Sequence, residues 1–70
     1  MDWDDRFREE YFQLSTRTEK LRQTLVNYKK GKLNFKPKCS YDLLNGQYKA
    51  MKLYLSYLEE RAEVEGLTLR

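Results

Sequence analysis

The chain has 70 residues, a net charge of +3, one cysteine and no histidine. A lone chain of this length buries only about 60% of the surface that its unfolded form exposes, so small domains usually need a disulfide, a metal or a partner. One cysteine excludes an internal disulfide, and without histidine it also excludes the usual structural zinc sites. Self-association or docking on another protein is therefore what we expect.

The sequence also predicts where the protein works. No stretch approaches the roughly 18 consecutive apolar residues of a membrane span. The opening MDWDDRF is acidic and lacks the apolar run of a signal peptide. A single free thiol fits a reducing compartment. We therefore expect a soluble, cytoplasmic protein with no membrane contact.

The first predicted element is an amphipathic helix over about residues 3–30. Apolar side chains recur there at spacings of three and four residues, which is typical of a helix with one buried stripe. Acids near its start and lysines near its end complement the helix dipole, and Gly31 can cap it. The stripe consists of Trp3, Phe7, Tyr11, Leu14, Thr18, Leu21, Leu25 and Tyr28.

The second element is a loop over about residues 31–39, in the middle of a basic block. Residues 20–41 carry seven bases and no acid, whereas the two flanking arms are mildly acidic. Two interpretations follow. The loop is either a binding site for an anion or a solvated turn whose charges complement the end of the first helix.

The third element is a helix over about residues 40–66. Pro37 prevents a helix from starting earlier, Ser40 is a good N-cap, and Gly66 is a plausible stop. The spacings of three and four residues return along this segment, so one face is again expected to be buried. The stripe consists of Tyr41, Leu44, Tyr48, Met51, Leu55, Leu58 and Ala62.

A second apolar row runs beside this stripe. One hairpin partner covers one stripe, so an additional row indicates a further contact. The row consists of Leu43, Ala50, Tyr54 and Tyr57.

Gly46 is an unusual residue within the second helix, because glycine costs a helix about 1 kcal/mol relative to alanine. Either the helix tolerates Gly46 in its first turns, or the helix begins near Gln47 and residues 33–44 are less regular. The missing side chain would also let another backbone or a ligand approach closely.

These elements predict an all-α fold: one domain, residues 1–70, forming an antiparallel helical hairpin that assembles into a helical bundle. Acids gather at the open end of the hairpin and lysines at the loop end. Two hairpins packed antiparallel would pair unlike ends, which favours a homo-oligomer over a monomer. The apolar residues expected at the interfaces are Trp3, Phe7, Tyr11, Leu14, Leu21, Leu25, Met51, Tyr54, Leu55, Tyr57 and Leu58. Trp3 is expected to plug the end of the bundle, and the alternative is an exposed anchor for a partner.

The residues predict a binding protein and no enzyme. Without histidine, and with Cys39 in a basic loop, no pair of nucleophile and base is visible. The acids lack the ordered loop of a calcium site, so no metal and no cofactor are expected. The lysine loop is the better candidate, since lysines attract phosphates and aromatic rings stack on bases. The candidate ligand-binding residues are Arg22, Tyr28, Lys29, Lys30, Lys32, Phe35, Lys36, Lys38, Tyr41 and Tyr48.

Two segments resemble a known family. The first contains Leu14, Arg17, Lys20, Leu21 and Leu25, and the second is QYKAMKLYLSYLEERAE, residues 47–63. Together they resemble the small helical accessory proteins of tailed phages typified by a crAss-like phage protein, over residues 7–62. The resemblance implies a phage protein that disarms host defences by stoichiometric binding inside the host cell.

The leading hypothesis is an oligomeric bundle that sequesters an anionic nucleotide immune signal. An alternative is an inhibitor that binds a host defence protein, such as a CRISPR nuclease, through Tyr54 and Tyr57. Further alternatives are a nucleic-acid-binding accessory factor, whose affinity would fall steeply with salt, and an assembly module whose loop binds nothing.

Overall fold

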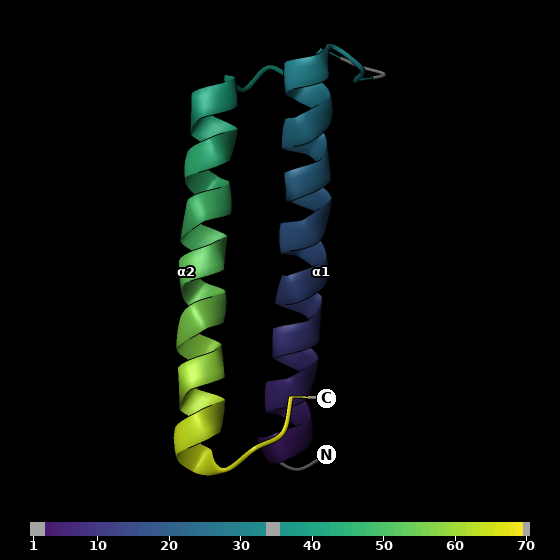
Figure 1. The fold of residues 1–70 in the computed structure, drawn as a ribbon. Helices are drawn as coiled ribbons and strands as arrows, with labels where there is room; N and C mark the ends of the chain where they lie inside the picture. The colour runs from purple at the N-terminus through teal and green to yellow at the C-terminus, as the bar shows by residue number, and fades with distance from the viewer. Residues whose placement is uncertain (1–2, 34–35, 70) are drawn as a thin grey trace.

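The computed structural model, which describes residues 3–33 and 36–69, is a pair of helices lying side by side and running in opposite directions (Figure 1). Helix α1 spans Trp3–Lys30 and helix α2 spans Tyr41–Glu65. The chain extends over 42 × 19 × 17 Å, as expected for a 28-residue helix that rises about 1.5 Å per residue. The predicted all-α helical hairpin is confirmed.

Local sequence signals explain the helix ends. The Ser40 side chain accepts a hydrogen bond from the Leu43 amide at 3.1 Å and so caps α2 as predicted. Gly31 and Gly66 follow the two helices with φ of 67° and 72°. Only glycine enters this left-handed region without strain, so both residues terminate their helices as predicted.

Helix α2 continues through Gly46, so the alternative start near Gln47 is wrong. A Cβ atom built on Gly46 would meet no atom within 4 Å. The hairpin therefore has no steric need for glycine here. Glycine costs the helix about 1 kcal/mol relative to alanine, and no packing contact among the described residues offsets that cost.

The largest buried apolar cluster lies at the open end of the hairpin, while Leu25 is buried nearer the loop. Phe7, Leu58 and Ala62 are buried against one another, and Tyr11 and Leu14 pack beside them. The predicted stripes face each other along the seam, because residues at spacings of three and four share one side of a helix.

The C-terminal segment completes this core in a way that the sequence analysis did not foresee. After Gly66 the chain turns back toward the start of α1 (Figure 1). Leu67 and Leu69 pack against the core cluster, and the Arg8 Nε atom donates a hydrogen bond to the Thr68 carbonyl oxygen at 2.8 Å. The tail thus fastens the end of α2 to α1.

The second apolar row remains uncovered in the hairpin. Leu43 is 64% exposed, Tyr57 is 58% exposed, and Leu53, which the sequence analysis did not include, is 57% exposed. Among the residues that the structure describes, neither helix is long and apolar enough to cross a membrane.

Candidate anion-binding site

The lysine loop closes the end of the hairpin opposite the two termini (Figure 1). The backbone turns at Gly31, and the Lys32 amide donates to the Asn27 carbonyl oxygen at 2.9 Å. Lysines on both sides of this turn are exposed to solvent. The exposed lysines are Lys29, Lys30, Lys32, Lys36 and Lys38.

Two tyrosines lie at the helix ends that the lysine loop connects. Tyr28 at the end of α1 meets Tyr41 at the start of α2 edge to face, with ring centroids 5.7 Å apart. The Tyr28 hydroxyl donates to the Cys39 carbonyl oxygen at 3.5 Å. The Lys29 ammonium lies 5.2 Å from the centre of the Tyr41 ring, within the range of a cation–π interaction. An aromatic face and a movable cation therefore adjoin one another.

Arg22 lies about two turns before the loop and already forms a salt bridge with Glu19. Its guanidinium donates to the Glu19 carboxylate through Nη2 at 2.6 Å and through Nε at 3.0 Å. This hydrogen-bonded pair lowers the pKa of Glu19 and, together with the charge of Glu19 and the nearby Tyr48, raises the pKa of Arg22. The positive charge of Arg22 is thus offset locally. The spacing of three residues on a helix signals such a pair in the sequence.

The structure brings together some of the predicted ligand-binding residues and separates others. Tyr28, Lys29 and Tyr41 form one cluster. Tyr48 lies two turns further along α2, where Lys52 instead places its ammonium 5.6 Å from the ring centre. Phe35 lies outside the described residues.

The predicted interface residues divide into a buried, a partly buried and an exposed group. Phe7, Leu25 and Leu58 are buried between the helices of one chain. Trp3 packs on Phe7 with ring centroids 5.4 Å apart and remains 48% exposed. Tyr57 lies on the outside of α2, whereas Tyr54 is 44% exposed and its hydroxyl donates a hydrogen bond to Glu10 on α1. The partly buried members are Tyr11, Leu14, Leu21, Met51 and Leu55.

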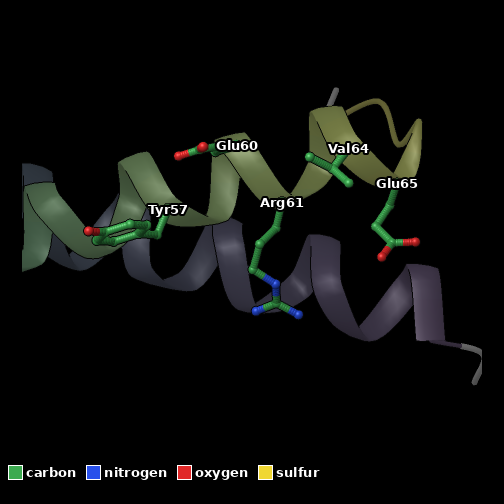
Figure 2. Close-up of a pocket in the computed structure, with 5 residues that line it drawn as sticks. All are labelled: Tyr57, Glu60, Arg61, Val64 and Glu65. Carbon is green, nitrogen blue, oxygen red and sulfur yellow. The ribbon is translucent and has the colours of Figure 1, made fainter.

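A hollow of about 310 Å³ on α2, which was not predicted from the sequence, is lined by Tyr57, Glu60, Arg61, Val64 and Glu65. Figure 2 shows Arg61 extending toward α1 and Glu60 pointing away from it. The Arg61 guanidinium lies 5.0 Å from the centre of the Phe7 ring. Four of the lining residues, Tyr57, Glu60, Arg61 and Val64, follow the spacing i, i+3, i+4, i+7. This spacing can be read from the sequence and was a signal that could have predicted the hollow.

Comparison with known proteins gives one match. The family model described as Sequestin matches residues 1–64, which is most of the chain. No curated protein and no solved structure matches the chain.

Proposed function

Because this chain belongs to the Sequestin family, we propose that it is a binding protein that sequesters an anionic nucleotide and does so without catalysis. The family name is that of a sequestering protein, and it is compatible with stoichiometric binding. In this proposal the chain acts as an oligomeric, phage-derived counter-defence protein in the host cytoplasm, and the captured nucleotide is an immune signal. The resemblance to small phage accessory proteins supports that setting.

The observation that carries the proposal is the lysine-rich loop that adjoins the Tyr28–Tyr41 pair, with Lys29 lying 5.2 Å from the Tyr41 ring centre. Residues 20–41 hold seven bases without an acid, so the positive potential at this end attracts phosphate groups. The nearby aromatic rings offer faces on which a base stacks. When a nucleotide binds, Lys29 leaves the face of Tyr41 for a phosphate, and the base takes its place on the ring.

Capture without turnover also fits the residues available. A sequestering protein needs affinity and needs no nucleophile or general base. Lysine ammonium groups form charge-assisted hydrogen bonds with phosphate oxygens, each contributing about 1.5–3 kcal/mol. Two or three such bonds together with one stacked base give a ligand that stays bound.

Isothermal titration calorimetry of the full chain with a panel of cyclic and linear nucleotides tests the proposal. We expect heat release with at least one nucleotide, and about tenfold or greater weakening when all five exposed loop lysines are replaced by serine. The matched comparison is Lys30→Ser with Lys32→Ser against Arg17→Ser with Lys20→Ser. Each pair removes two exposed charges, but only the first pair belongs to the loop end.

Three other results would contradict the proposal or favour a different function. The absence of heat and of thermal stabilisation with every nucleotide would contradict it. A stable complex with a purified defence nuclease that does not depend on the loop lysines would favour the protein-binding inhibitor, which the exposed Tyr57 and Leu53 side chains would serve. Binding to DNA or RNA that falls steeply with salt would favour a nucleic-acid-binding factor.

A further inference from the structure

The outer side of α2 carries a second heptad stripe that the described residues of the hairpin leave exposed. Its members follow one another at spacings of three and four residues, interrupted by Glu60, and lie on the side of the helix opposite the seam. Leu43, Leu53, Tyr57 and Val64 are between 57% and 80% exposed. We call this surface the outer stripe. It consists of Leu43, Gly46, Ala50, Leu53, Tyr57 and Val64.

No described contact in the hairpin requires glycine at position 46. On the outer stripe, however, a residue without a side chain can let another helix approach. A Cβ atom there would touch nothing within 4 Å, and alanine would form a better helix. Gly46 and Ala50 together leave a shallow place on an otherwise bulky surface. Small residues at such a position let a second helix approach closely or admit a large side chain from it.

The outer stripe is complementary to itself when two copies run in opposite directions. With the two-fold axis near Leu53, Tyr57 of one copy comes to lie over Gly46 and Ala50 of the other. The same register brings Leu43 to the hollow of about 310 Å³ that contains Tyr57 and Val64 (Figure 2). The i, i+3, i+4, i+7 spacing of its lining residues is that of the holes that receive such knobs in helix pairs.

The charges select the same orientation. At the open end, residues 3–10 and 59–69 carry eight acids and three bases. At the loop end, the described residues between 27 and 42 carry five lysines and one acid. Antiparallel docking places unlike ends together, whereas parallel docking would place like ends together. Lys49 and Glu60 lie along the same edge of the stripe. Like edges of two antiparallel copies face each other, so Lys49 of one copy lies on the same side as Glu60 of the other.

We propose that the outer stripe of α2 is the surface on which a second copy of this chain docks antiparallel. This inference deepens the oligomeric part of the proposed function and rests on it there. The lysine loop stays accessible in this arrangement. Lys29 and Lys30 belong to α1, so about one helix diameter, 10 Å, separates them from a copy on the far side of α2, which is close to the screening length in physiological salt.

Sedimentation equilibrium of the full chain without nucleotide tests the surface. We expect a dimer or a multiple of it, and a loss of association of at least about thirtyfold for Tyr57→Glu and for Leu53→Glu. Both side chains are exposed in the hairpin, so helicity by circular dichroism is expected to be unchanged. Phe12→Glu is the control, since Phe12 is 48% exposed on α1 and lies off the stripe.

The orientation is tested separately through Cys39, the single cysteine, which is exposed. Spin labels on Cys39 of two antiparallel copies are expected roughly 40–45 Å apart, from 14 residues at about 1.5 Å per residue on either side of the axis near Leu53. A parallel pair would place them within roughly 15 Å. A monomeric wild-type chain, association that survives both glutamate substitutions, or a short distance between labels would each overturn the proposal.

The failure of this inference is distinguishable from the failure of the proposed function, because mass and nucleotide binding are measured independently. A monomeric chain that releases heat with a nucleotide would overturn the outer stripe as an interface and leave sequestration standing. An antiparallel dimer that binds no nucleotide would support the outer stripe as an interface and would overturn sequestration of a nucleotide.

Discussion

Tyr54 on α2 donates a hydrogen bond from its hydroxyl to the Glu10 carboxylate on α1. A second bond of the same kind joins the helices on the other side, where the Tyr11 hydroxyl donates to Glu59 at 2.9 Å. Each helix therefore contributes one tyrosine and one glutamate. The two bonds cross the seam beside the core and fix the rotation of one helix relative to the other.

The Tyr54 bond predicts a pH-dependent stability. The bond to Glu10, followed by burial and the negative charge of Glu10, raises the pKa of Tyr54 above its ordinary value. The neutral hydroxyl is favoured in the folded state, so this stabilisation is complete below the unfolded pKa near 10 and is lost as pH rises through the folded pKa. Urea unfolding at a series of pH values is expected to show a smaller loss of stability above pH about 10 for Tyr54→Phe than for wild type. Tyr57→Phe, which has no such bond among the described contacts, is expected to follow wild type, and identical curves for wild type and Tyr54→Phe would contradict the assignment.

Two identical glycine substitutions are expected to have opposite effects. Gly46→Ala adds a methyl group into open space in a helix and is expected to stabilise the hairpin by about 0.5–1 kcal/mol. Gly66→Ala places a side chain at φ of 72° and is expected to destabilise it by about 1 kcal/mol. Thermal unfolding in the Tyr57→Glu background, which removes association through the outer stripe, measures both. Effects of the same sign would show that the helix does not run through Gly46 as described.

Leu67 and Leu69 are expected to stabilise the chain although they lie beyond α2. Both pack on the core cluster of Phe7, Leu58 and Ala62. Replacing either by serine is expected to cost about 1 kcal/mol, since each side chain is partly buried. Hydrogen exchange should report faster opening of the first turns of α1. Thr68→Ala is the control, because Thr68 contributes its backbone carbonyl to the bond with Arg8 and alanine retains that group.

The Glu19–Arg22 pair predicts an affinity change at the candidate site. Glu19→Gln removes the carboxylate that holds the guanidinium and frees Arg22 to face the loop end. If the site binds a nucleotide as proposed, calorimetry is expected to show binding that is tighter by about two- to fivefold. Glu9→Gln makes the same charge change in a glutamate that likewise accepts from a side chain on its own helix, Gln13. Glu9 lies about 15 Å further from the loop, so an equal gain in both variants would exclude a specific role for Arg22.

The sequence by itself determined the hairpin and its ends. The stripes from Phe7 to Tyr28 and from Tyr41 to Ala62 are periodic, and periodicity reports which side of a helix is buried whatever covers it. Ser40 and Gly66 act through bonds to residues within four or five positions, so their effects are visible locally. The lysine block is visible in the composition, and the pairing of Glu19 with Arg22 follows from their spacing of three residues. Both features can therefore be predicted from the sequence.

Only the tertiary structure decided how the two helices meet. Leu67 and Leu69 return to pack on the cluster of Phe7, Leu58 and Ala62 at the open end, and nothing in the spacing of residues 66–69 indicates that return. The cation–π contact of Arg61 with Phe7 and the bond between Tyr54 and Glu10 join residues more than forty positions apart. Such contacts depend on the register and rotation of one helix against the other. These are set by the packing of both faces together, and no single stretch of sequence contains them.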